Sequence, residues 1–304
     1  MKVELRKALA TGLLGLLALP LLAQEFQAGP PLSAINQAGD YVPMSDNVKV
    51  YGSFHFTESC TFDAKKNLIV SMNAGSREAG APADGFVSLI NPDGSVHTPR
   101  FIGLTRDGLE LVDPIGSAVR NDVLYTVDSG YLRSFDLASG RPLNSFQIPG
   151  AGFLNGIGVA ADGTAFISDS NNGVILEVSP TGNSSVFYQG PALDRPNGVA
   201  IDNDGNIVVV NINTNDVVTF NREGEVILTE HSFEAGNDGV VVTGDGTKYT
   251  SSVRFGSVSR IRPGQEAEVI ASGIPSAASM CYDSVQHQLV IPMNPNNALA
   301  FIKL

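Results

Sequence analysis

The sequence is poor in the side chains on which most metal clusters and serine hydrolases depend. Its 304 residues include two cysteines, four histidines and no tryptophan. Two thiols are too few for a metal cluster, although in an exported protein Cys60 and Cys281 can be oxidised, so a disulfide and a pair of buried free thiols are both open. No histidine is spaced to serve Ser129 or Ser170, each of which follows an aspartate, and a serine-nucleophile mechanism is therefore disfavoured.

Positive charge is also scarce. The chain has 19 Lys and Arg against 31 Asp and Glu, a net charge of −12. Such a balance opposes binding to nucleic acid or to an anionic membrane. Cations and neutral small molecules are the expected partners.

Long apolar runs are absent except at the start of the chain. Residues 1–23 place Lys2, Arg6 and Lys7 before an apolar run from Ala8 to Leu22, which is too short to span a bilayer comfortably. We expect a signal peptide cleaved near Ala23 and a periplasmic or secreted protein, with an uncleaved anchor as the alternative. Cleavage would remove Lys2, Glu4, Arg6 and Lys7, which together carry a net charge of +2, and would so change the net charge of the chain from −12 to −14.

Helical periodicity is nearly absent after the signal, and short β-rich runs take its place. Runs such as "GVAIDN", "NIVVVN", "DVVTFN" and "EVILTE" are separated by turn signals such as Asp204-Gly205. Four such runs in about 40 residues are typical of a propeller blade.

The blades recur at a regular spacing. The strand starts at Asn155, Asn197 and Asp238 are 42 and 41 residues apart, and weaker matches fall 41 residues earlier at Pro114 and 40 residues later at Ala278. With Glu58 this gives six starts. The sequence therefore predicts an all-β, six-bladed β-propeller over residues 47–304, with four antiparallel strands per blade.

The ends of the chain are predicted to close the ring. The last unit lacks an outer strand, and residues 47–54, "NVKVYGSF", would supply it as an N-terminal strand in the last blade. Residues 24–46, rich in Ala, Gly and Pro, are expected to form a linker or a surface wrap.

Four oxygen-bearing side chains stand at equivalent starts: Glu58, Asn155, Asn197 and Asp238. Because equivalent positions of a closed ring converge on one axis, these side chains are predicted to cage a hard divalent cation, Ca²⁺ or alternatively Mg²⁺. Each Asn-Gly or Asp-Gly pair alone is better explained by a turn. In register, they favour a metal site, with Asp238 as the catalytic base or nucleophile.

These motifs resemble those of the senescence marker protein, gluconolactonase and diisopropyl-fluorophosphatase family of six-bladed propellers. The resemblance runs from about Asn47 to the C-terminus and is strongest in "ESCTFD", "LNGIGV", "RPNGVAIDNDG" and "NDGVVV". It implies that Glu58, Asn155, Asn197 and Asp238 surround a catalytic metal. It also implies hydrolysis of lactones or related esters.

The expected substrate pocket departs from that of the sugar lactonases. Where those carry an arginine just before the blade-3 Asn, this chain has Phe153 and Leu154, which suggests a less polar ligand. Arg195 either binds substrate or faces water, and Asp113 either binds metal-bound water or caps a turn. His55 is a candidate acid or base, although its odd offset from Glu58 favours the opposite face of the strand.

Three functions are therefore in competition. The first is an exported calcium-dependent hydrolase of a neutral lactone or ester. The second is a non-catalytic propeller that binds a ligand or partner protein and holds a structural metal, and the third is a repeat scaffold without metal. A pocket that excludes water around the ion would favour the enzyme, and a broad apolar rim would favour the binder.

Overall fold

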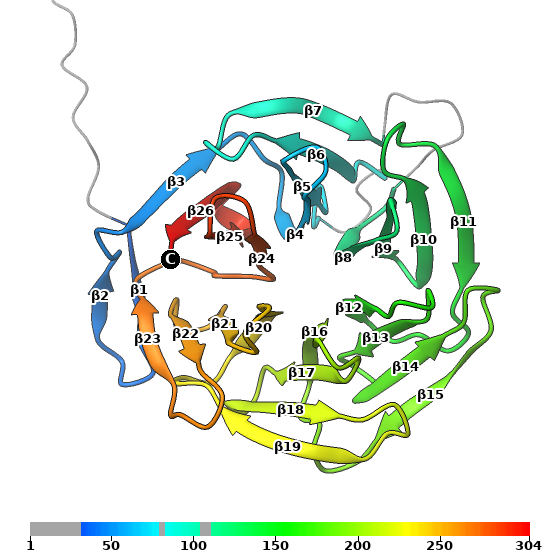
Figure 1. Ribbon diagram of the computed structural model, residues 1–304. Coiled ribbons are helices and arrows are strands. Elements are labelled where there is room, and N and C mark those ends of the chain that lie inside the picture. The colour runs from blue at the N-terminus through cyan, green and yellow to red at the C-terminus, as the bar shows by residue number, and fades with distance from the viewer. Residues whose placement is uncertain (1–31, 79–82, 104–110) are drawn as a thin grey trace, which may run out of the picture. The chain divides into compact units, whose positions relative to one another are not determined.

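The computed structural model describes residues 32–78, 83–103 and 111–304. The described residues form six four-stranded antiparallel sheets around a central axis, together with a two-stranded hairpin (Figure 1). They contain no α-helix, and their single helical turn is the 3-10 helix η1, Asn294–Asn296. The predicted all-β, six-bladed propeller is confirmed. The predicted signal peptide, residues 1–23, lies outside the described residues.

In each blade the strands are given in order from the one nearest the axis to the outermost one. Blade 1 contains β4 (Thr57–Asp63), β5 (Leu68–Asn73), β6 (Phe86–Ile90) and β7 (Val96–Ile102). Blade 2 contains β8 (Pro114–Arg120), β9 (Val123–Asp128), β10 (Tyr131–Asp136) and β11 (Pro142–Gln147). Blade 3 contains β12 (Leu154–Val159), β13 (Ala165–Asp169), β14 (Val174–Val178) and β15 (Ser184–Gln189). Blade 4 contains β16 (Pro196–Ile201), β17 (Ile207–Asn211), β18 (Asp216–Phe220) and β19 (Val226–His231). Blade 5 contains β20 (Asn237–Val242), β21 (Lys248–Ser252), β22 (Val258–Ile261) and β23 (Glu268–Ala271). Blade 6 contains β24 (Cys281–Asp283), β25 (Gln288–Met293), β26 (Ala298–Lys303) and β3 (Val48–Gly52).

The two ends of the propeller chain meet in blade 6, as predicted. β3 pairs antiparallel with β26, with Val48 opposite Ile302 and Gly52 opposite Ala298. Each inner strand contacts the inner strand of the next blade, and β24 contacts β4, so the cycle is complete. Each inner strand is still the edge of its four-stranded sheet, but the repetition around the ring keeps these edges short and protected by the neighbouring blades.

A disulfide reinforces the closure. Cys60 on β4 is bonded to Cys281 on β24, with their Cα atoms 5.3 Å apart. The bond links the inner strands of blades 1 and 6, which are 221 residues apart in sequence. By restricting so long a loop in the unfolded chain, it would stabilise the fold by about 4–5 kcal/mol.

The core lies between neighbouring blades. The second strand of blade 4, β17, is apolar on both faces and buried along its whole length, because each of its faces packs against another blade. Outer strands such as β19 are largely exposed. Burial therefore decreases from the strands near the central channel to the outer strands.

The described part of the predicted linker, residues 32–46, lies against the propeller. It forms a hairpin of β1 (Ser33–Ile35) and β2 (Tyr41–Pro43). The Gln37 backbone N–H donates to Glu234 Oε1 at 3.0 Å, and Met44 packs into the core shared by blades 5 and 6. The segment therefore covers an edge of the propeller.

None of the helical structure in the described residues is long and apolar enough to cross a bilayer.

Candidate metal centre

The inner strands run in one direction along the channel, so that their starts lie together at one end. A cavity of about 260 Å³ at this end is lined by Glu58, Asn155, Asn197 and Asp238, from four different blades. These four side chains are only 7%, 5%, 3% and 4% exposed. The structure thus brings together all four residues that the sequence predicts to share an ion.

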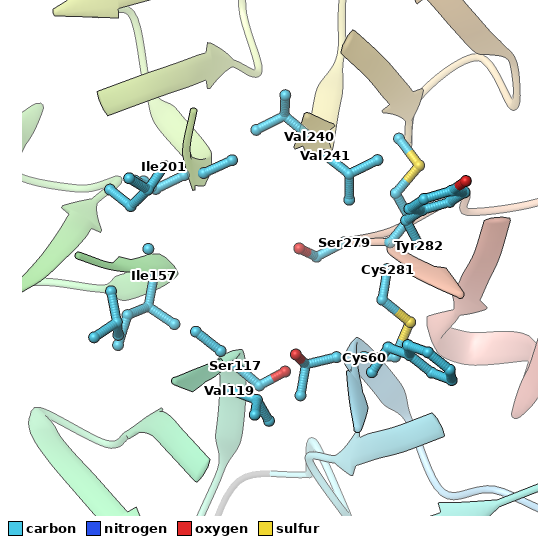
Figure 2. Close-up of a pocket in the computed structure, with 18 of the residues that line it drawn as sticks. Cys60, Ser117, Val119, Ile157, Ile201, Val240, Val241, Ser279, Cys281 and Tyr282 are labelled. Atoms are coloured by element: carbon cyan, nitrogen blue, oxygen red, sulfur yellow. A yellow bond between two sulfur atoms is a disulfide. The ribbon is translucent and has the colours of Figure 1, made fainter. Parts of the chain in front are cut away.

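The opposite end of the channel has a different lining. A second cavity, of about 360 Å³, is lined by later residues of the same strands, including Val119, Ile157, Ile201, Val240 and the Cys60–Cys281 disulfide (Figure 2). Side chains two to four residues along a strand lie roughly 7–13 Å further along it. The two cavities therefore occupy opposite ends of one channel.

A β-bulge lies at each candidate ligand. The pairing between the first and second strands shifts register between Thr57 and Ser59, between Leu154 and Ile157, between Pro196 and Val199, and between Asn237 and Gly239. A bulge locally re-aims the side chains of the strand that contains it. It therefore accounts for polar side chains that face the channel at the start of apolar strands.

Close approach between blades explains the glycine that follows the ligand. A Cβ atom added to Gly156 would lie 2.2 Å from the backbone oxygen of Asn197, and one added to Gly198 would lie 2.5 Å from that of Asp238. Both glycines lie inside strands, and neither has a positive φ. The Asn-Gly pairs therefore serve blade-to-blade packing, and the turn explanation does not apply to them.

The same test with an added Cβ atom corrects the predicted alignment of blade 2 with blade 3. A Cβ atom on Gly116 would lie 2.0 Å from the backbone oxygen of Asn155, so Gly116 is equivalent to Gly156. The residue equivalent to Asn155 is therefore Ile115, and not Pro114 as the spacing predicts. The error arises because the interval from Ile115 to Asn155 is 40 residues whereas the next two intervals are 42 and 41, so a nearly constant period misplaces the start by one residue.

Serine hydroxyls brace the ligand strands from the next blade. Ser168 Oγ donates to the backbone oxygen of Asn197 at 2.6 Å, and Ser170 Oγ donates to that of Pro196 at 2.6 Å. In blade 5, Ser251 Oγ donates to the backbone oxygen of Ala278 at 2.6 Å. These bonds hold the start of each inner strand against the second strand of its neighbour.

The last residue of the second strand fixes the loop that enters the inner strand. Asp169 accepts hydrogen bonds from the backbone N–H groups of Gly152 and Phe153, at 2.7 and 2.9 Å. Asn211 Oδ1 accepts one from the Asp194 N–H at 2.9 Å. These bonds place Phe153 and Arg195 in the cavity lining, as the sequence suggests.

The polar atoms inside the cavity are only partly satisfied. Asn197 Nδ2 donates to Asp238 Oδ2 at 3.1 Å, and Asn155 Nδ2 donates to Ser170 Oγ at 3.3 Å. Asn294, from η1 in blade 6, donates to Glu58 Oε2. Within the described residues, however, the buried oxygens Asn197 Oδ1 and Asp238 Oδ1 have no hydrogen-bond partner. Orphaned buried oxygens are costly unless another group binds them.

Burial perturbs both carboxylates. Burial raises the pKa of Asp238 to about 7, although the hydrogen bond from Asn197 opposes the shift. Burial, followed by the charge of Asp238, raises the pKa of Glu58 well above its usual range. The charge of Asp238 acts on Glu58, in keeping with the two carboxyl groups lining the same cavity from blades 5 and 1. A divalent cation would relieve both the burial of charge and the repulsion.

The donor set fits a hard cation. In the described parts of the chain no three His, Cys, Asp or Glu side chains cluster as a metal site, and here two carboxylates are joined by two carboxamides. Their charge of −2 balances a divalent ion, and carboxylate and amide oxygens are the ligands that Ca²⁺ and Mg²⁺ prefer. The two orphaned oxygens are consistent with this use.

Two of the candidate pocket residues lie elsewhere. The side chain of His55 is 47% exposed and its Nδ1 lies 3.6 Å from Asp84 Oδ2, while Asp113 forms an ion pair with Arg77. Neither is among the described residues that line the cavity. His55 precedes β4 in a bend, where strand alternation does not apply, and the negative charge of Asp113 acts on the site only by raising the pKa of Glu58.

Sequence reasoning missed several lining residues. Ser170, Ile212 and Val253 each immediately follow the second strand of blades 3, 4 and 5, and Arg254 follows Val253. The first three repeat at intervals of 42 and 41 residues, the same period as the ligands. That register could have identified them. Asn294 has no such signal, because it comes from a helical turn present in one blade.

Comparison with known proteins agrees with this architecture. Residues 129–232 match the model of the SMP-30/gluconolactonase/LRE-like region, a segment that includes Asn155 and Asn197. The chain resembles the gluconolactonase family. The resemblance that the sequence predicts is therefore confirmed over this segment. No curated protein matches the chain.

Several solved structures share the fold. A gluconolactonase of Xanthomonas campestris is 19% identical, with a TM-score of 0.62, and the alignment covers 92% of this chain and 99% of that one. Virginiamycin B lyase of Staphylococcus aureus is 13% identical, with a TM-score of 0.58 and coverage of 84% and 99%. A Bacteroides thetaiotaomicron protein of unknown function is 14% identical, with a TM-score of 0.63 and coverage of 84% and 72%. At these identities the likeness supports the fold alone.

Proposed function

We propose that the protein is an exported, calcium-dependent hydrolase that acts on a lactone or related ester. One observation carries the proposal. Four oxygen-bearing side chains from four blades meet in a single small cavity, and two of their buried oxygens have no partner among the described residues. The family match over residues 129–232 favours this chemistry over others that the fold supports.

Glu58, Asn155, Asn197 and Asp238 are the proposed ligands, with Ca²⁺ as the ion and Mg²⁺ as the alternative. Water would complete the six to eight ligands that calcium takes. When bound, the ion would act as a Lewis acid on the substrate carbonyl. Asn294 would orient Glu58, since its amide donates to Glu58 Oε2.

Asp238 is the proposed general base. Its carboxylate is held by Asn197 through Oδ2, while Oδ1 faces no partner among the described residues. Burial raises the pKa of Asp238 in the metal-free chain, and a bound cation would lower it again, so that Asp238 is a carboxylate able to accept a proton when the ion is present. Asp238 would take a proton from the attacking water while Phe153, Ile212 and Val253 cover the carbon skeleton of the substrate.

Export is supported by the disulfide. Disulfides persist in oxidising compartments and are rare in the cytosol. The Cys60–Cys281 bond therefore supports the export that the predicted signal peptide implies.

A combined calcium and substrate test addresses the proposal. The melting temperature is measured with calcium and with chelator, and hydrolysis is then measured on a panel of lactones and esters. We expect calcium to raise the melting temperature and to support hydrolysis, and expect Asp238→Asn and Glu58→Gln each to lower kcat/KM on the order of 10³-fold. Asp204→Asn, an exposed turn carboxylate, is the matched control.

The outcomes separate the competing functions. Full activity in Asp238→Asn and Glu58→Gln would show that the site is wrong. Stabilisation by calcium without hydrolysis of any substrate would support the non-catalytic propeller with a structural metal. If calcium does not raise the melting temperature, the third function, a repeat scaffold without metal, is supported.

A further inference from the structure

Two arginines in the cavity lining have no role in the proposed chemistry. Arg195 lies in the loop that enters β16, and Arg254 lies just after β21, so they come from the adjacent blades 4 and 5. Both residues are exposed overall although they line a cavity whose ligands are buried. They therefore stand between the candidate ion and solvent, where a substrate must enter.

Arg254 is oriented without being neutralised. Its Nη2 donates to Asn213 Oδ1 at 2.8 Å, and Asn213 Nδ2 in turn donates to Asp194 Oδ1 at 2.8 Å. The neutral amide of Asn213 thus lies between the guanidinium of Arg254 and the carboxylate of Asp194. Arg77, at the same end of the channel, differs because it forms a direct ion pair with Asp113.

Arg195 occupies an unfavourable backbone conformation. Its φ is +59°, a region that disfavours side chains other than those of Gly, Asn and Asp. Of the ten described non-glycine residues with positive φ, Arg195 is the one that lines this cavity. Its guanidinium makes no hydrogen bond or ion pair with the described residues. Strain of this kind, at a cost of about 1 kcal/mol or more, is found where function requires the residue.

The charges of the cavity lining then favour a negatively charged ligand. Glu58 and Asp238 balance a divalent ion, so Arg195 and Arg254 leave the lining of this cavity with an excess of positive charge, while Asp194 lies outside the lining. In a protein whose net charge is −12, that excess is local. Guanidinium groups bind carboxylates through paired, charge-assisted hydrogen bonds.

We propose that the substrate is a small carboxylate-bearing lactone or ester, with its carboxylate bound by Arg195 and Arg254 and its carbon chain covered by Phe153, Ile212 and Val253. This inference rests on the proposed hydrolase function, and it replaces the neutral substrate that the sequence suggests. The cavity of about 260 Å³ lies just below the usual range for small-molecule sites, which limits the substrate to a compact one.

A pair of esters of similar length tests the charge preference. In the calcium-loaded protein, monomethyl succinate carries a carboxylate where methyl butanoate carries a methyl group. We expect kcat/KM to be higher for the succinate. Arg254→Gln and Arg195→Asn should each lower the ratio of kcat/KM for the succinate to kcat/KM for the butanoate on the order of 10-fold or more.

The variants are matched to the structure. Arg195→Asn removes the charge and keeps a residue that tolerates positive φ, so the loop is retained. Arg195→Lys keeps the charge and should recover part of the ratio. Arg141→Gln removes one positive charge from an exposed position in blade 2 and should leave the ratio unchanged.

Calorimetric titration with glutarate gives a readout independent of catalysis. Glutarate should bind the calcium-equilibrated protein and lose affinity on the order of 10-fold in Arg254→Gln and Arg195→Asn, whereas pentane-1,5-diol should not bind. If no ester or lactone is hydrolysed but glutarate binds in this arginine-dependent way, the hydrolase is wrong and the anion site stands. If hydrolysis occurs but the two esters react equally in all variants, or glutarate binding is the same in all variants, the anion site is overturned and the hydrolase stands.

Discussion

The two ends of the channel are built from the same six strands and differ in almost every other respect. At the strand starts, side chains from four blades bring carboxylates, amides and guanidinium groups into a cavity of about 260 Å³. At the strand ends, the cavity is larger and lined mainly by Val, Ile and Ala side chains and a disulfide (Figure 2). Because the strands are shared, the chemistry depends on a few residues at their starts, while the ring supplies position.

The bulges and glycines explain how one strand serves both ends. On β12, a Cβ atom at Gly156 would strike the backbone of blade 4, whereas one at Gly158 would meet the side chain of Ile201 at 3.2 Å. Backbones are therefore in tight contact beside the ligands and looser beyond them. Close contact fixes the ligand positions, and the looser end accommodates larger apolar side chains.

Removal of the disulfide is expected to have the largest effect on stability and to leave the polar end intact. The double variant Cys60→Ala/Cys281→Ala should lose about 4 kcal/mol of the free energy of unfolding, because the bond closes a very long loop. The stability is measured by urea unfolding. Calcium affinity, measured separately on the folded variant, should change by less than about threefold. A large loss of calcium affinity would mean that the two ends are coupled.

A pair of glycine variants on one strand compares the ends directly. Gly156→Ala should lower the free energy of unfolding by about 2–3 kcal/mol and weaken calcium binding, since the new methyl group must push the Asn197 backbone away. Gly158→Ala should cost about 1 kcal/mol or less. Urea unfolding with and without calcium measures both. Equal costs for the two variants would contradict the difference in backbone contact.

The pH dependence of the metal-free protein should come from the polar end. The folded pKa of Asp238, about 7, is above that of the unfolded chain, so its contribution to stability is complete below about pH 4 and is lost as pH rises through 7. We expect the free energy of unfolding to fall by about 1–3 kcal/mol between pH 5 and pH 8.

Asp238→Asn should reduce this dependence to the part that comes from Glu58, whose pKa burial also raises. Calcium should stabilise the wild type more at pH 8 than at pH 5, because its ligands must be deprotonated. Chelator-treated protein in urea gives the measurement. A metal-free protein that is equally stable at the two pH values would show that Asp238 titrates normally.

The sequence predicts the ring and its ligands because both follow from repetition. Period and turn chemistry locate the six starts, and the orphan strand at residues 47–54 predicts the closure. The same repetition also predicts that equivalent side chains meet, so Glu58 and Asp238, far apart in sequence, end in one cavity.

Features that do not repeat regularly from blade to blade are not predicted from the sequence. The residue of blade 2 equivalent to Asn155 is Ile115 and not Pro114, because this interval is 40 residues whereas the next two are 42 and 41. Asn294 comes from a turn specific to blade 6. The orientation of Arg254 depends on Asn213 from another blade, a contact that no local pattern encodes.

Calcium titration calorimetry tests the central claim most directly. The account predicts one ion per wild-type chain and a loss of affinity on the order of 100-fold when any one of the four ligands is changed, by Glu58→Gln, Asn155→Leu, Asn197→Leu or Asp238→Asn. Ile115→Leu, at the equivalent position in blade 2, should bind like the wild type. Binding that survives in the four ligand variants, or no binding by the wild type, would contradict the account.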